Sequence, residues 1–123
     1  MFCPGSQPEE NTRALAILLA CLADLDEGYL MHNAAPPLYR SGVRYGRTEV
    51  WDTIPACLAK GYGDCKTLTA WRIAELRRAG IDAAPVFRWV QRPSNPQVLD
   101  YHILVGLPDG SFEDPSRNLG MTD

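Results

Sequence analysis

The chain has 123 residues, of which 46% are hydrophobic and 22% are charged, and this balance predicts one globular domain and excludes a wholly disordered chain. Its 15 acidic and 12 basic residues give a net charge of −3, which argues against a nucleic-acid binder that relies on a broad basic face. No stretch approaches the roughly 20 apolar residues that a membrane-spanning helix needs.

A first amphipathic helix is predicted in the N-terminal part of the chain. An apolar stripe at helical spacing is formed by Leu15, Leu18, Leu19, Leu22 and Leu25. Start signals are supplied by Ser6, Pro8, Glu9 and Glu10, and Gly28 is expected to end the helix.

The same segment contains Leu18-Leu19-Ala20-Cys21, which is typical of a bacterial lipoprotein cleavage box. The preceding residues carry Glu9 and Glu10 beside a single Arg13, whereas a signal sequence needs a positively charged start. We therefore interpret the segment as a core helix and expect a cytoplasmic protein, with association with a virus particle as the alternative.

Two further helices are predicted on either side of Gly61-Tyr62-Gly63. A short helix spans Thr53 to Lys60, with Thr53 as its cap residue and Gly61 at its end. A longer helix begins after Asp64, which is expected to act as a cap, and ends before Gly80.

After Gly80 the pattern changes to strands, predicted over Pro85 to Gln91, Tyr101 to Leu107 and Ser111 to Asp114. Helices followed by antiparallel strands predict an α+β fold, with the central helix packed on a small antiparallel sheet. No internal repeat or second domain is evident, so residues 1–123 are expected to form a single domain.

The loop between the last two strands decides whether His102 and Asp114 share a face. A two-residue Asp109-Gly110 loop would put Asp114 on the face away from His102. A three-residue Pro108-Asp109-Gly110 loop, with Gly110 in a left-handed conformation, fits the sequence better and places Asp114 opposite Leu104. A contact between His102 and Asp114 is then within reach, with Asp100 and Glu113 expected to face solvent.

Cys65 differs from Cys3, Cys21 and Cys57 because it lies in the first turn of the predicted central helix. The helix dipole and free N–H groups there favour an anion, so a lowered thiol pKa is expected. No Cys-x-x-Cys pair exists and the only histidines are His32 and His102, so no metal site is expected. Free thiols in a reducing compartment are favoured.

Cys65, His102 and Asp114 thus supply a nucleophile, a base and an orienting acid. The segments Gly61 to Lys66 (GYGDCK), Tyr101 to Val105 and Phe112-Glu113-Asp114-Pro115 resemble the transglutaminase-like superfamily of papain-like cysteine enzymes. Glu49-Val50-Trp51 is similar to its bacterial and phage cysteine-peptidase branches. The resemblance covers residues 49 to 121.

The resemblance implies a papain-like catalytic core over residues 49–123, behind a helical N-terminal part over residues 1–48. It implies that Cys65 is the nucleophile, His102 the base and Asp114 the orienting acid of a triad that cleaves peptide or amide bonds through a thioester. A protein or peptide substrate is expected, with no cofactor, nucleic acid or membrane.

An oxyanion hole would use the Cys65 N–H and a second donor, for which Trp51, Tyr45 and Tyr62 are candidates. Trp51 and Tyr62 are alternatively cleft walls or core residues. Two other functions stay open: a transglutaminase-type amine acyltransferase, and a non-catalytic phage assembly or interaction module that binds structural partners.

Overall fold

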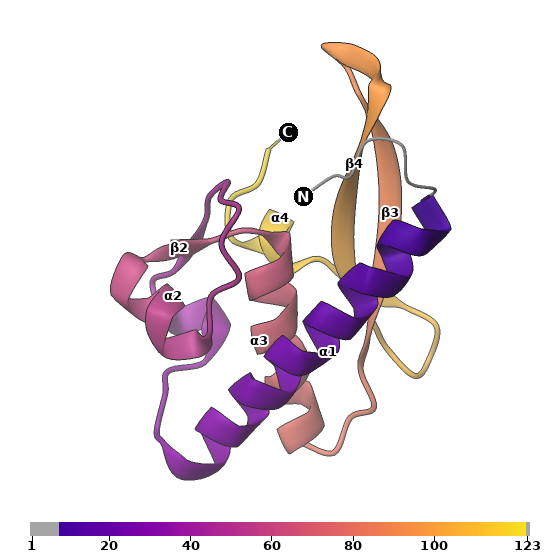
Figure 1. The fold of residues 1–123 in the computed structure, drawn as a ribbon. Helices are drawn as coiled ribbons and strands as arrows, with labels where there is room; N and C mark the ends of the chain where they lie inside the picture. The colour runs from indigo at the N-terminus through magenta and orange to yellow at the C-terminus, as the bar shows by residue number, and fades with distance from the viewer. Residues whose placement is uncertain (1–7, 123) are drawn as a thin grey trace.

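The computed structural model describes residues 8–122 (Figure 1). Its helices are α1 (Pro8–His32), the 3₁₀ helix η1 (Leu38–Arg40), α2 (Ile54–Lys60), α3 (Cys65–Arg78) and α4 (Pro115–Asn118). Its strands are β1 (Arg44–Tyr45), β2 (Tyr62–Gly63), β3 (Ala84–Arg92), β4 (Asn95–Gly106) and β5 (Phe112–Glu113). Figure 1 shows α1 crossing α3, with the β3–β4 hairpin standing beside them. This arrangement confirms the α+β class.

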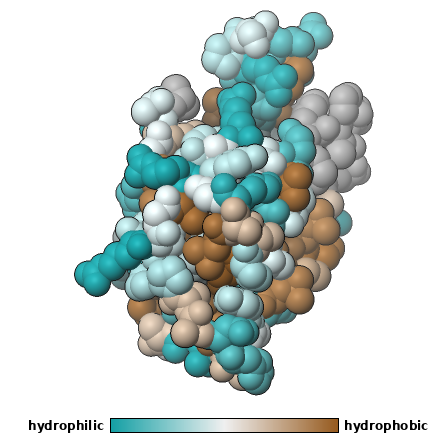
Figure 2. Space-filling view, turned by 90° about the vertical axis from the view of Figure 1, so that its left-hand side faces the viewer, coloured by the Kyte–Doolittle hydropathy of each residue, from teal (hydrophilic) through white to brown (hydrophobic). Residues whose placement is uncertain are grey.

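Strands β3, β4 and β5 form one antiparallel sheet in that order, and β1 pairs with β2 in parallel. Because β5 pairs only with Val105 and Gly106, the rest of the outer edge of β4 has no strand beside it within residues 8–122. Strand β4 begins at Asn95, earlier than predicted, because Pro96 and polar neighbours hide its strand pattern. The end of the hairpin is exposed and mostly hydrophilic (Figure 2).

Helices α2 and α3 begin and end where the sequence predicts. Gly61 ends α2 and Gly80 follows α3, and both glycines have a φ of 84° that other residues rarely adopt. Asp64 caps α3, because its Oδ1 accepts a long hydrogen bond of 3.5 Å from the Thr67 N–H. These local signals fix where α3 starts, and Cys65 is its first residue.

The start of α2 is capped from α1. Thr53, the predicted cap residue, makes no side-chain cap bond. The Ile54 N–H instead donates to Oδ1 of Asp26 over 2.9 Å. Asp26 is fully buried, and its Oδ2 has no hydrogen-bond partner in the described part of the chain. Burial therefore raises the pKa of Asp26 to about 7.

The prediction that α1 ends at Gly28 is wrong, since the helix continues to His32. Tyr29 and Leu30 follow the glycine and pack against a hydrophobic cluster. Their burial offsets the roughly 1 kcal/mol that a glycine costs inside a helix.

The buried stripe of α1 is narrower than predicted. Leu18 and Leu25 are 44% and 62% exposed. The buried side of the helix consists of Leu15, Leu19, Leu22, Ala23 and Asp26. Asp26 is thus buried where the leucine pattern predicted that its neighbour Leu25 would be buried. No helix in residues 8–122 is both long and apolar enough to cross a membrane.

Helix α3 is buried on two sides, between two hydrophobic clusters. Ala70 and Ile73 belong to the first cluster, which joins α3 to α1 and β4. Leu68 and Trp71 belong to the second, which joins α3 to α2 and η1. Packing on both sides holds the first residue of this helix, Cys65, in a defined place.

Candidate active site

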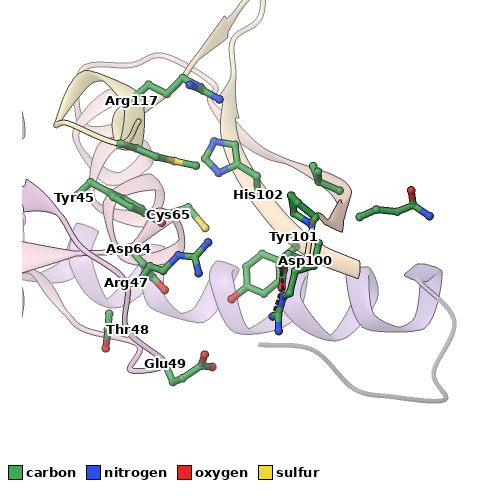
Figure 3. Close-up of a pocket in the computed structure, with 15 residues that line it drawn as sticks. Tyr45, Arg47, Thr48, Glu49, Asp64, Cys65, Asp100, Tyr101, His102 and Arg117 are labelled. Atoms are coloured by element: carbon green, nitrogen blue, oxygen red, sulfur yellow. Dashed lines mark hydrogen bonds and ion pairs between the residues drawn. The ribbon is translucent and has the colours of Figure 1, made fainter. Parts of the chain in front are cut away.

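A pocket of about 420 Å³ opens at the start of α3 (Figure 3). It is lined by residues 45 and 47–49, by Asp64 and Cys65, by residues 90–93 and 100–102 of the hairpin, and by Arg117 and Met121. Two of the three predicted triad residues, Cys65 and His102, therefore face one cavity. The open outer edge of β4 makes this possible, because no strand among residues 8–122 lies between that part of β4 and α3.

The hairpin wall of the pocket is polar. Nη2 of Arg92 lies 2.7 Å from Oδ1 of Asp100, and Nε lies 3.0 Å from Oδ2. The hydrogen bonds from Arg92 lower the pKa of the Asp100 carboxyl. Asp100 was expected to face solvent; its side chain is 38% exposed, and it also lines the pocket, paired with Arg92.

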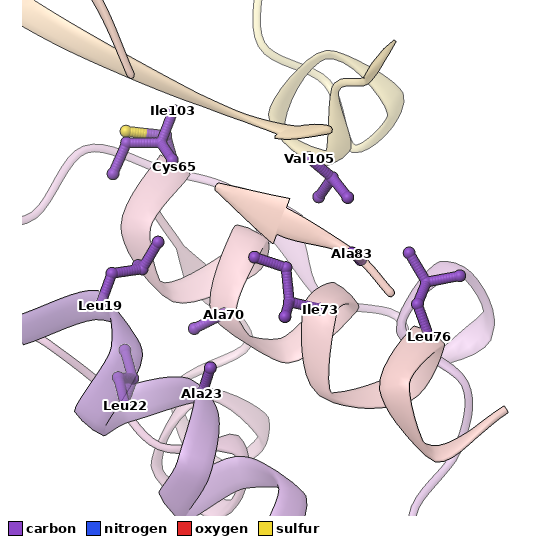
Figure 4. Packing of buried hydrophobic residues seen from close by; sticks show 10 residues of the cluster. All are labelled: Leu19, Leu22, Ala23, Cys65, Ala70, Ile73, Leu76, Ala83, Ile103 and Val105. Atoms are coloured by element: carbon purple, nitrogen blue, oxygen red, sulfur yellow. The ribbon is translucent and has the colours of Figure 1, made fainter. Parts of the chain in front are cut away.

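Cys65 is only 7% exposed and belongs to the first hydrophobic cluster, against Ile103 (Figure 4). Burial raises the pKa of its thiol to about 11, and the negative charge of Asp64 acts in the same direction. A hydrogen bond from the Ile103 backbone lowers it by less. The predicted lowering of this pKa is wrong, because desolvation outweighs the effect of the helix start.

His102 and Asp114 are in direct contact. Nε2 of His102 lies 2.9 Å from Oδ2 of Asp114, and the two side chains are 17% and 19% exposed. The carboxylate also accepts the Arg117 N–H over 3.2 Å at Oδ1. Because Nε2 is occupied by the carboxylate, Nδ1 is the imidazole nitrogen that remains for a thiol.

The hairpin register that produces this contact is the predicted one. The Leu107 N–H donates to the Ser111 carbonyl over 2.9 Å, and Gly110 has a φ of 87°. Val105 faces Glu113, which confirms the three-residue loop.

Figure 3 shows the Cys65 sulfur and the His102 ring facing the same pocket, from α3 and β4 respectively. The structure thus places Cys65 and His102 in the wall of one pocket, with Asp114 in contact with His102.

Two tyrosines also line the pocket near the thiol. Burial raises the pKa of both Tyr45 and Tyr101, and the nearby Cys65 is the second cause in each case. Both hydroxyls therefore keep their protons and can donate hydrogen bonds. Tyr45 was a candidate oxyanion donor, whereas Tyr101 was missed. Successive residues of a strand point to opposite faces of a sheet, so strand alternation gives no signal that Tyr101 and His102 line one cavity.

Trp51 and Tyr62, the other two candidates, do not line this pocket in the described part of the chain. Trp51 packs against the first hydrophobic cluster, and the Lys66 ammonium lies 5.6 Å from the centre of its ring. The Tyr62 ring lies over Gly46, where an added Cβ would be 2.8 Å from the ring. The lining of this pocket therefore gives no support to either side chain as an oxyanion donor, and both roles stay predictions.

Lys66 is fully buried, which the sequence did not indicate. Its Nζ donates to the Thr48 carbonyl over 3.0 Å and forms a short ion pair with Asp64. Since Thr48 lies in the pocket wall and Asp64 caps α3, Lys66 joins that wall to the helix start. No group of three metal-ligating side chains occurs in the part of the chain that the structure describes.

Comparison with known proteins gives no relative: no family model, no curated protein and no solved structure matches the chain.

Proposed function

We propose that this chain is a cysteine-dependent hydrolase of peptide or amide bonds, with a papain-like core of the transglutaminase-like type. Cys65 would be the nucleophile, His102 the general base and Asp114 the orienting acid. The observation that carries the proposal is the 2.9 Å contact between His102 and Asp114 at a pocket that Cys65 also lines. A base held by an acid beside a thiol is the arrangement that acyl transfer requires.

The first half of the reaction forms a thioester. Because burial raises the pKa of Cys65 to about 11, the resting sulfur is a thiol. Nδ1 of His102 takes the thiol proton as the sulfur attacks the substrate carbonyl carbon. The C–N bond of the tetrahedral intermediate then breaks, and the imidazolium returns the proton to the leaving amine. Asp114 stabilises the imidazolium between these two transfers.

The second half releases the acyl group. His102 removes a proton from water, whose oxygen attacks the thioester carbon, and the C–S bond breaks. The proton returns to the sulfur and the product is a carboxylic acid, so atoms and charges balance without a cofactor. A primary amine in place of water would give the transglutaminase reaction.

Negative charge on the carbonyl oxygen needs fixed donors. The Cys65 N–H is one, because the first N–H groups of a helix have no partner within the helix. A hydroxyl of Tyr45 or Tyr101 would be the second, since both side chains line the pocket and stay protonated.

One observation favours a second candidate function, a non-catalytic interaction module. Cys65 is 7% exposed and its thiol pKa is raised, as in a cysteine that only fills a core. The two functions differ in their response to loss of the sulfur.

The test is cleavage of a diverse peptide mixture, read by mass spectrometry. We expect the wild-type protein to generate new termini and Cys65→Ala to generate none. Cys21→Ala is the matched control, because Cys21 is exposed on α1 and should be dispensable. Asp114→Asn should retain more activity than Cys65→Ala, since the acid makes no covalent bond. Identical peptide profiles for wild type and Cys65→Ala would favour the module.

Hydrolysis and transamidation are separated by running the reaction in water enriched in ¹⁸O with a primary amine present. Hydrolysis predicts ¹⁸O in the product carboxylate. Products that carry the amine and no ¹⁸O would instead assign a transglutaminase.

A further inference from the structure

Arg72 and Glu113 form an ion pair beside the proposed triad, and no step of the proposed reaction uses it. Nε of Arg72 lies 2.5 Å from Oε2 of Glu113, and Nη2 lies 3.4 Å from Oε1. The side chains are 24% and 20% exposed, so solvent screens the pair only in part. Glu113 was expected to face solvent, and its contact with Arg72 on α3 corrects that expectation.

Three more side chains extend this ion pair. Nη1 of Arg72 lies 3.2 Å from Oε1 of Glu75 on the same helix, and Tyr39 and Asn118 lie on the side of Glu113. The Tyr39 hydroxyl donates to Oε2 of Glu113, and Nδ2 of Asn118 lies 3.2 Å from the same hydroxyl. Burial and the bond to Glu113 raise the pKa of Tyr39, so its hydroxyl keeps its proton. Glu113 is the last residue of β5 and Asn118 the last of α4. The network therefore holds the chain both before and after Asp114.

The same face of α3 carries Cys65, Thr69 and Arg72, which are spaced four and three residues apart. The Thr69 hydroxyl donates to the Ile103 carbonyl of β4 over 3.2 Å. Arg72 then reaches Glu113 of β5. The helix that begins with the nucleophile is thus joined at two points to the hairpin that carries the base and the acid.

We propose that Arg72 and Glu113 are positioning residues that set the His102–Asp114 pair against Cys65, an inference that rests on the proposed function. Asp114 follows Glu113 directly, so movement of one carboxylate displaces the other. A displacement of about 1 Å in a reacting geometry can cost about a hundredfold in rate. Since neither positioning residue lines the pocket, substrate binding should change little.

The kinetic test compares Arg72→Gln, Glu113→Gln and the double variant with the wild type. Arg78→Gln is the matched control, because Arg78 is an exposed arginine on the same helix. We expect each single change to lower kcat about tenfold, within the range that misalignment produces, with KM altered less than about twofold. The double variant should lose about as much as Arg72→Gln alone, because that change already removes the bonds of Arg72 to both Glu113 and Glu75. An unchanged kcat, or a change in KM alone, would overturn the positioning role.

A second readout needs no turnover. In ¹⁵N-labelled protein the imidazole N–H of His102 that bonds Asp114 is followed by NMR, together with its exchange with water. We expect exchange several-fold faster in Glu113→Gln and in the milder Tyr39→Phe, and wild-type exchange in Arg78→Gln. Thermal midpoints of every variant are recorded, and all measurements are made where each variant is fully folded.

The two readouts separate two failures. If the wild type cleaves nothing but its His102 signal responds to Glu113→Gln, the proposed hydrolase function is overturned. The structural coupling of Glu113 to His102 then still stands. A wild type that is active, with kcat and His102 exchange both insensitive to these changes, overturns the positioning role alone. An inactive wild type whose His102 signal does not respond overturns both.

Discussion

The Thr69 hydroxyl donates to the Ile103 carbonyl oxygen over 3.2 Å, and the backbone of Ile103 also bonds the Cys65 sulfur. The backbone groups of Ile103 therefore point toward α3. They lie on the edge of β4 that a longer β5 would cover. In the observed register Ile103 would face Pro115, which has no N–H to donate. The sequence Asp114-Pro115 thus ends β5 and leaves room for the helix that carries Cys65.

The hairpin loop gives a first prediction. Gly110 has a φ of 87°, so Gly110→Ala should destabilise the protein by about 1 kcal/mol and weaken the contact between His102 and Asp114. Gly28→Ala is the control, because Gly28 lies inside α1 with open space around its Cα. That change should stabilise by up to about 1 kcal/mol. Urea unfolding of both variants checks that the two changes in the free energy of unfolding have opposite signs. Equal changes for the two variants would contradict a left-handed Gly110.

The contact between His102 and Asp114 could be predicted because it follows from local turn chemistry at Pro108-Asp109-Gly110. The surroundings of Cys65 could not be predicted from the sequence. The helix-start effect on its thiol is local and readable, whereas its burial depends on how Ile103 packs across the molecule.

The same limit applies to the buried charges. Nothing near Lys66 in the sequence indicates that its ammonium meets the Thr48 carbonyl, 18 residues earlier. Nor does the leucine pattern of α1 indicate that Asp26 caps α2, 28 residues later. Contacts between distant segments require the tertiary fold, and these contacts shape the pocket wall and the core.

Asp26 predicts an unusual dependence of stability on pH. Its pKa is raised from 3.8 to about 7 by burial, so the folded state holds a proton that the unfolded state has released. The contribution of Asp26 to stability is therefore full below about pH 4, falls as the pH rises to 7, and is constant above. Asp26→Asn should remove this slope while keeping an oxygen acceptor for the Ile54 N–H.

The measurement is the free energy of unfolding in urea between pH 4 and pH 8. Asp24→Asn, an exposed change two residues earlier on α1, should keep the wild-type slope. Parallel pH profiles for wild type and Asp26→Asn would show that Asp26 is ionised in the folded protein.

The thiols should differ in reactivity in the free protein. Thiolate is the reactive form, and burial raises the pKa of both Cys57 and Cys65 to about 11. Cys21 is exposed and should be alkylated first at pH 8, with the two buried thiols at least about tenfold slower. Because Cys3 lies outside the described residues, the experiment uses Cys3→Ser.

Limiting iodoacetamide followed by peptide mass spectrometry measures these rates. In urea the three thiols should react at similar rates, which controls for local sequence. If Cys65 were labelled before Cys21 in the folded protein, the helix start and His102 would lower the pKa of its thiol by more than burial raises it.

Finally, Lys66→Met should be among the most destabilising single changes in this protein. The ammonium is fully buried and pairs with Asp64, whose pKa is raised by burial despite that partner. Removing the lysine leaves a buried carboxylate unpaired, which typically costs about 3 to 5 kcal/mol. Asp64→Asn added to Lys66→Met should recover part of the loss, because asparagine also caps helices and carries no charge. Urea unfolding followed by tryptophan fluorescence measures both variants. A double variant no more stable than Lys66→Met would mean that the bond to the Thr48 carbonyl, and not the charge of Asp64, is what Lys66 supplies.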